Sequence, residues 1–315
     1  MIEWLSHVDI WRWQNLLGLT ACVVVISMES PLPRALKIFW GYCLLSSLWV
    51  FQHPYKSATY SLCFDQTTGQ AFSQMMLMPL LVALLPRKYF KNWRAVFTGV
   101  AVFESVMLGF FGYGLMSAKT FDTAFIAMIV PVVANPYLKG LLALTALGHG
   151  GATAALVLLT AVVVNMWRTR KYRAWIIAVG IIAITIASKY IDSSGRVMYW
   201  KAFFKWWNTQ RVQIFGTGIG TFEWMPRLVK DMQLDDRIFL QMHNDWLQML
   251  FEGGVAGLAL MVAAFVYVYK KSERHTQRQA VLCASVCMLT YHPSHFFIAG
   301  LFIICLIREV LENES

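Results

Sequence analysis

One polar stretch of the chain, roughly residues 190–252, combines a histidine with several arginines. Its arginines are Arg196, Arg211, Arg227 and Arg237. His243 opens a segment that becomes apolar and helical, so we expect its imidazole at a membrane surface beside Asn244 and Asp245. Histidine exchanges protons near neutral pH, and arginine binds diphosphate through paired hydrogen bonds. The combination favours group transfer from a lipid-linked phosphate over the alternative, a histidine with a structural role only.

A glycine-rich run, FGTGIGTF at residues 215–222, precedes His243. Glycine lets a backbone approach another surface closely, which makes Gly218 and Gly220 candidates for such a contact. A plain loop is the alternative, and a nucleotide site is disfavoured because no strand, turn and helix surround the run. The stretch has no Asp-x-Asp sequence, and we interpret the acidic pair at 235–236 as a solvated patch. We therefore predict neither a metal ion nor a cofactor.

The elements that hold these residues are expected to be membrane helices. Of 315 residues, 58% are hydrophobic and 14% are charged, against roughly 25% charged in a soluble domain. We predict one all-α membrane domain over residues 1–315 with about 10–12 transmembrane helices, since a span needs about 20 mostly apolar residues. The expected spans lie near 14–28, 35–51, 70–86, 95–116, 121–134, 137–148, 150–167, 174–189, 253–269, 279–292 and 294–307.

Three short basic connections between apolar runs predict the topology. They contain Arg87, Lys88, Lys91 and Arg94; Arg168, Arg170, Lys171 and Arg173; and Lys270, Lys271, Arg274 and Arg278. Short loops rich in Lys and Arg face the cytoplasm, so residues 190–252 are expected on the outer, periplasmic side. The same clustering accounts for the net charge of +10 without a nucleic-acid partner.

Three further patterns concern the helices themselves. Pro131 and Pro136 interrupt the apolar runs over 121–148, which predicts broken or re-entrant helices there. In the outer stretch, the spacing in RVMYWKAFFKWW predicts a short amphipathic helix near 196–208. The cysteines fall mostly in apolar runs, so we expect them to pack in the core rather than to form disulfides or bind metal.

Two blocks in the outer stretch resemble the O-antigen ligase family and the related bacterial protein O-oligosaccharyltransferases. His243 and Asn244, nine residues, Gly254, two residues and Gly257 fit the pattern H-[N/S/Q]-x9-G-x-x-[G/T/Y]. Upstream, SSGRVMYWKAFFKWW followed by FGTGIGTF resembles that superfamily's Arg, Trp and G-x-G-x-G-x-F block. The resemblance covers roughly residues 193–260. It implies a GT-C-like all-α fold in a bacterial inner membrane, with the active-site loop in the periplasm.

The resemblance also implies an activity and a set of partners. Such an enzyme takes a glycan from undecaprenyl diphosphate and transfers it to an acceptor hydroxyl, inverting the anomeric carbon without a metal ion or a nucleotide sugar. The acceptor would be lipid A–core, a growing glycan or a protein hydroxyl, which leaves open a ligase, a polymerase or a protein transferase in cell-surface polysaccharide biosynthesis. Membrane lipids are further expected partners.

Residue roles follow from the same resemblance. His243 maps to the family's essential histidine, which would activate or orient the acceptor hydroxyl. Arg196 maps to an arginine that would bind the diphosphate and stabilise the leaving group. Asn244, Gly254 and Gly257 are expected to shape the loop and to let the helix pack closely. The candidate diphosphate or glycan contacts are Arg211, His149, Asn244, Gly218 and Gly220.

The sequence departs from the family in two respects. His149, in ALGHGGATAAL, stands where the family has an arginine; it would bind phosphate only when protonated, and a backbone-satisfied histidine is the alternative. The chain is also short for the family at its N-terminal side, and this shortness together with His149 motivates the alternative of a non-catalytic binder of lipid-linked glycan. A transporter or flippase is the alternative of another class. The spans carry few ionisable residues, Glu104 being the clearest, and this disfavours transport.

Overall fold

A computed structural model of the chain describes residues 92–112, 119–167, 196–209, 213–216, 242–290 and 297–312. Every regular element among these residues is a helix, in agreement with the expected all-α class. Two of them, Trp93–Phe111 and Asp245–Lys271, are long and apolar enough to cross a membrane, and Asp122–Val132 and Ala152–Trp167 are shorter apolar helices. The spans expected near 14–28, 35–51, 70–86 and 174–189 lie outside the described residues.

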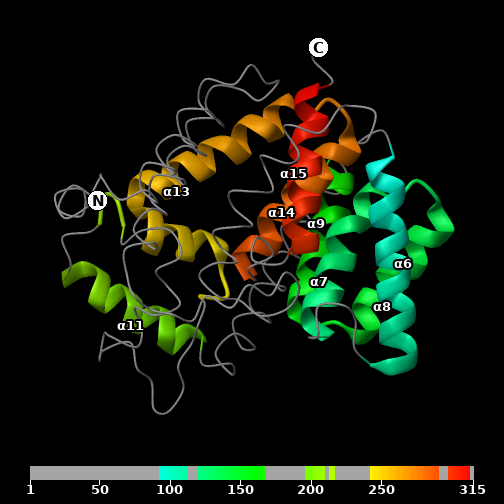
Figure 1. Cartoon of the computed structure of the whole chain (residues 1–315), viewed down its shortest axis with the longest axis horizontal. Coiled ribbons are helices and arrows are strands. Elements are labelled where there is room, and N and C mark those ends of the chain that lie inside the picture. Colours follow the sequence, from blue (N-terminus) through cyan, green and yellow to red (C-terminus); the bar gives the residue numbers. More distant parts are fainter. Residues whose placement is uncertain are drawn as a thin grey trace, which may run out of the picture.

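The larger group of helices packs around one apolar core (Figure 1). It contains α6 (Trp93–Phe111), α7 (Lys119–Ile129), α8 (Pro136–His149), α9 (Ala152–Trp167), α14 (His275–Thr290) and α15 (Phe297–Glu312). Helix α14 is central, because it contacts α7, α9, α15 and the long helix α13 (Asp245–Lys271). Aromatic rings join α6 to α15: the Phe302 ring centroid lies 5.7 Å from that of Trp93 and 5.5 Å from that of Phe97. Such edge and tilted contacts stabilise a core beyond the area they bury.

The helix break expected at the two prolines is confirmed. Helix α7 ends at Ile129, and the short 3-10 helix η2 (Val130–Val132) contains Pro131. Helix α8 then begins at Pro136, in the first turn, where a missing N–H costs nothing. The Asn135 side chain caps it by accepting hydrogen bonds from the backbone N–H groups of Tyr137 and Leu138, at 2.9 and 3.1 Å.

Two long-range hydrogen bonds set the direction of α9 against α14. The Gln279 amide donates to the Ala161 carbonyl at 2.9 Å, and the Cys283 thiol donates to the Val157 carbonyl at 3.4 Å. Residue numbers rise along one helix as they fall along the other, so the helices are antiparallel. The end of α9 at Trp167 therefore lies level with the start of α14, and the start of α9 lies level with its end.

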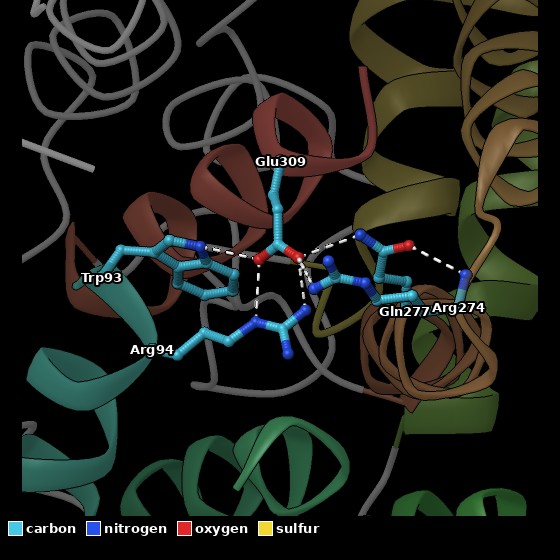
Figure 2. A network of polar contacts seen from close by, with 5 residues as sticks. All are labelled: Trp93, Arg94, Arg274, Gln277 and Glu309. Carbon is cyan, nitrogen blue, oxygen red and sulfur yellow. Dashed lines mark hydrogen bonds and ion pairs between the residues drawn. The ribbon is translucent and has the colours of Figure 1, made fainter. Parts of the chain in front are cut away.

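A polar network around Glu309 joins α15 to the starts of α6 and α14 (Figure 2). The Glu309 carboxylate accepts hydrogen bonds from Trp93 Nε1 at 2.8 Å, Arg94 Nε at 2.8 Å and Gln277 Nε2 at 2.9 Å. Arg94 Nη2 forms a second bond to the same carboxylate, and Arg274 Nη1 lies 3.8 Å from it. Two basic connections thus meet at one end of the bundle, which we call the basic end. The end of α9, next to the remaining basic connection, lies on the same side.

Large apolar side chains face outward from the bundle. Phe110 of α6 is 81% exposed, and Tyr137 and Leu144 of α8 are 87% and 69% exposed. Exposed apolar surface of this kind marks contact with a partner or a membrane. Together with the two helices that are able to span a bilayer, it indicates association with a membrane. Glu104 points the other way, because it is fully buried on α6.

The remaining helices position the candidate site. Helix α13 (Asp245–Lys271) changes direction at Gly254, whose φ of 68° and ψ of −170° are not helical (Figure 1). We call residues 245–253 its first arm and residues 255–271 its second arm. Helix α11 (Arg196–Thr209) packs against the first arm, away from α6 and α8 (Figure 1). The amphipathic helix expected near 196–208 is thereby confirmed.

Candidate functional site

An aromatic cluster holds α11 against the first arm of α13. Trp206 stacks on Phe251 with ring centroids 5.2 Å apart, and the Phe203 ring lies 5.7 Å from Phe251. Tyr199 belongs to the same cluster and is 1% exposed. Burial raises the pKa of the Tyr199 phenol well above its usual range, because a phenolate would lose its hydration there. The two helices are therefore held together by a contact between buried aromatic side chains.

A hydrogen bond links the two sequence blocks directly. Trp200 Nε1, in the first turns of α11, donates to the backbone carbonyl of Met242 at 3.1 Å. Met242 is buried and immediately precedes His243. Arg196, the first residue of α11, lies four residues before Trp200, about 6 Å along the helix axis. The backbones of Arg196 and His243, the two predicted catalytic residues, thus lie on either side of the hydrogen bond between Trp200 and Met242.

His243 has an unusual backbone conformation. Its φ of 51° is the single positive value found at a non-glycine residue in the described part of the chain. Left-handed conformations cost a non-glycine residue roughly 1–2 kcal/mol and are found preferentially at functional sites. The residue is half-buried, and its Nδ1 atom is buried. The turn therefore fixes the backbone from which the imidazole projects at the start of α13.

Asn244 fixes that turn to the bundle. Its side-chain oxygen caps α13 by accepting from the Leu247 backbone N–H at 3.0 Å, and its Nδ2 donates to the Leu289 carbonyl at 2.8 Å. Trp246 Nε1 adds a bond to the Ser285 carbonyl at 3.1 Å. Both polar atoms of the Asn244 amide contact the protein itself, which favours the loop-shaping role over glycan contact. These bonds also place His243 at the end of the bundle opposite the basic end, because Leu289 lies near the end of α14.

Gly254 makes a close backbone contact with residues 213–216, and we call this contact the glycine clasp. The Val255 and Ala256 N–H groups donate to the carbonyls of Gln213 and Ile214, both at 2.9 Å. Gly216 also has a left-handed φ, of 71°, and a Cβ added there would lie 2.5 Å from the Gly254 nitrogen. Neither glycine has room for a side chain. The N–H groups that start the second arm are thereby used by the protein and are not offered to a phosphate.

Other predicted residues lie elsewhere or outside the described ranges. His149 is the last residue of α8, three positions before α9 begins at Ala152, and it is half-buried. It therefore ends α8 and does not begin α9. A cationic imidazole at the end of a helix interacts favourably with the helix dipole. It shares the end of the bundle that carries His243. Gly257 is buried on the second arm. Outside the described residues lie Arg211, Gly218, Gly220, Arg227 and Arg237.

A buried polar face of the first arm adds residues that the sequence analysis did not select. Asp245, Gln248 and Glu252 are 4%, 4% and 2% exposed and recur at helical spacing below His243. Gln248 Nε2 donates to Glu252 Oε1 at 3.3 Å. The signal was the spacing of these residues, since positions i, i+3 and i+7 share one side of a helix. No group of three or more metal-ligating side chains gathers among the described residues.

The sequence matches no protein-family model and no curated protein. The described part of the chain defines the class of the protein as an all-helical one with two helices that are able to cross a membrane. At the end opposite its basic end, this protein presents a half-buried histidine on a strained turn, braced by Trp200 of α11 and by Asn244.

Proposed function

We propose that the protein transfers a glycan from undecaprenyl diphosphate to an acceptor hydroxyl on the periplasmic face of a bacterial inner membrane, in the manner of an O-antigen ligase. The observation that carries the proposal is the hydrogen bond from Trp200 to the Met242 carbonyl. It joins the helix that begins at Arg196 to the turn that presents His243. A diphosphate-binding cation and a proton acceptor are the two groups that such a transfer requires.

The chemistry assigned to the site is a displacement at the anomeric carbon. His243 accepts the proton of the acceptor hydroxyl, and the hydroxyl oxygen forms a bond to the anomeric carbon. The bond from that carbon to the diphosphate oxygen breaks, and its electron pair leaves with the diphosphate. Arg196 balances the charge that develops on the leaving group. Because Nδ1 of His243 is buried, Nε2 is the nitrogen assigned to the acceptor hydroxyl.

The rest of the architecture supports a periplasmic site. The ends of α6, α9 and α14 that adjoin basic connections lie at one end of the bundle, and His243 lies at the other. Because basic loops stay in the cytoplasm, this arrangement supports an outer location for the histidine. It fits a GT-C-like membrane domain with many spans whose outer loop, residues 190–252, carries the site.

The test is a transfer assay with the purified full-length protein, undecaprenyl-diphosphate glycan and a panel of acceptors: lipid A–core, free glycan and a Ser/Thr peptide. His243→Ala should lower the rate at least about 100-fold, the contribution of a general base. Arg196→Ala should lower both the rate and the affinity for the donor. His275→Ala is the matched control, because His275 is also half-buried but begins α14 at the basic end.

The outcomes separate the candidate functions. Transfer that survives both His243→Ala and Arg196→Ala would refute the residue assignment. A wild-type protein that binds the donor but transfers nothing to any acceptor would favour a non-catalytic binder. Donor that crosses the membrane of a proteoliposome without being consumed would favour a flippase. The preferred acceptor distinguishes a ligase from a polymerase or a protein transferase.

A further inference from the structure

Helix α11 has two faces of different character. One face carries Tyr199, Phe203, Trp206 and Trp207, which are buried against the first arm of α13. The other face consists of Met198, Lys201, Phe204, Lys205 and Asn208, all of them exposed. The aromatic packing fixes which face points outward. We call this second set of residues the lysine face.

The charge of α11 has a single sign. The helix RVMYWKAFFKWWNT contains basic residues and no acidic residue. Lys201 and Lys205 are one turn apart, so their ammonium groups project from the same side. Neither lysine pairs with a carboxylate in the described part of the chain. The lysine face is therefore a small cationic surface whose counter-charge has to come from outside this helix.

Apolar side chains flank the two lysines. Met198 is 56% exposed and Phe204 is 40% exposed on the same face. A helix that faces only water gains nothing from such residues. A helix in the headgroup layer buries them at the acyl boundary, while lysine stems extend so that the ammonium groups reach the phosphates. The mixture of lysine with exposed apolar side chains fits an anionic lipid surface better than it fits bulk solvent.

The neighbour of α11 is a helix suited to a bilayer. Phe203 and Trp206 pack on Phe251, three residues before the bend at Gly254. Beyond the bend, the second arm belongs to one of the helices long and apolar enough to cross a membrane. Helix α11 is thus held beside the point where α13 changes direction, with the lysine face directed away from the protein.

From these observations we propose that the lysine face binds the headgroups of anionic phospholipids, such as phosphatidylglycerol, at the membrane surface. The interaction would anchor α11, and through Trp200 the turn before His243, to the lipid layer. The proposal concerns lipid contact alone and holds whether or not the protein transfers glycans.

The test uses the purified full-length protein in micelles of a neutral detergent. Brominated phosphatidylglycerol or brominated phosphatidylcholine is titrated in, and quenching of tryptophan fluorescence reports lipid contact near the 13 tryptophans of the chain, three of which are on α11. The lysine variants isolate the part of the quenching that depends on the lysine face. Wild-type protein should bind phosphatidylglycerol more tightly than phosphatidylcholine, with the difference reduced by added salt. The double substitution Lys201→Gln and Lys205→Gln should weaken phosphatidylglycerol binding about thirtyfold, since each lysine near an anionic surface contributes about 1 kcal/mol.

Two control variants make the result specific. Lys201→Arg with Lys205→Arg retains both charges and should keep the lipid preference. Lys270→Gln removes an exposed lysine at the basic end, far along α13 from α11, and should change quenching little. Both replaced lysines of α11 are exposed, so the aromatic face should stay packed and the unfolding temperature without lipid should not move.

Three results would overturn the proposal. The first is equal quenching of the wild type by the two lipids, which would leave the lysine face to a protein partner. The second is unchanged phosphatidylglycerol binding in the double glutamine variant. The third is displacement of phosphatidylglycerol by soluble inorganic diphosphate, which would identify the face as a diphosphate site and not as a membrane contact.

Discussion

Removal of the Glu309 carboxylate tests the packing of the basic end most directly. The carboxylate accepts hydrogen bonds from Trp93, Arg94 and Gln277, and it pairs with Arg274 (Figure 2). Trp93 and Arg94 belong to α6, Gln277 belongs to α14 and Arg274 directly precedes α14, so one substitution loosens the attachment of α15 to both helices. Glu309→Ala leaves the Arg94 guanidinium without its carboxylate, and Glu309→Gln keeps the volume but removes the charge.

The magnitude follows from how far the pair is shielded from water. The Glu309 side chain is 16% exposed and the Arg94 side chain is 29% exposed. Exposed ion pairs contribute up to about 1 kcal/mol, whereas removal of one partner from a fully buried pair costs about 3–5 kcal/mol. The intermediate exposure puts Glu309→Ala at about 2–4 kcal/mol. Glu309→Gln should cost about half as much, because its amide oxygen can still accept some of the hydrogen bonds.

The chain contains its own reporters for the assay. Cys283, Cys287 and Cys305 are free and buried, so a fluorogenic maleimide reacts with them only as the protein opens. In detergent, Glu309→Ala should lower the unfolding midpoint by roughly 4–10 °C. Glu273→Ala is the control, because Glu273 is exposed on the connection between α13 and α14. A midpoint for Glu309→Ala no lower than that of the control would refute the assignment of Glu309 as the link between α15 and its neighbours.

Two further predictions use the same thermal assay. Gly254→Ala should cost more than about 2 kcal/mol, because a Cβ there is strained by the backbone conformation and meets the 213–216 backbone. The unfolding midpoint of Gly254→Ala should be lower than that of Gly112→Ala, because Gly112 has a φ of 76° but open space around it. It should also be lower than that of Gly140→Ala, because Gly140 is helical and in open space. Equal midpoints would contradict the clasp. Burial raises the pKa of Tyr199 above 10.0, so the stability that depends on its neutral phenol is present below pH 10 and lost as the pH rises further. Tyr199→Phe should therefore lose less stability between about pH 9 and pH 11 than wild type, whereas equal losses would contradict that cause.

The positions of the described helices could be predicted from local pattern, because apolar length and aromatic spacing are properties of a continuous segment. The runs expected at 95–116, 150–167 and 196–208 correspond to α6, α9 and α11 within a few residues. The expected span at 253–269 is different: α13 already begins at Asp245, and only its second arm follows the apolar run. The first arm is helical although it contains polar residues, because Asn244 caps its start and the arm packs against the rest of the protein.

The candidate site shows the same division between local and long-range information. His243, Asn244 and Gly254 could be selected from their spacing, but the contacts that give them their conformations come from distant residues. Trp200 is 42 positions from the Met242 carbonyl that it binds, and the N–H groups after Gly254 find acceptors in residues 213–214. No periodicity within the motif specifies either partner. The left-handed φ of His243 was likewise not legible from the sequence, since its turn is set by the residues on both sides of it.

The spacing within the motif has a physical reason. The nine residues between Asn244 and Gly254 are the first arm of α13, and the arm is fixed at both ends. Asn244 and Trp246 attach its start to α14, and the glycine clasp attaches its end to residues 213–216. One inserted residue would rotate one end by about 100° relative to the other, so the two attachments could not form together. The length of the motif therefore fixes the angle at which the first arm presents Phe251 to α11. The position of α11 in turn determines where its first residue, Arg196, lies relative to His243.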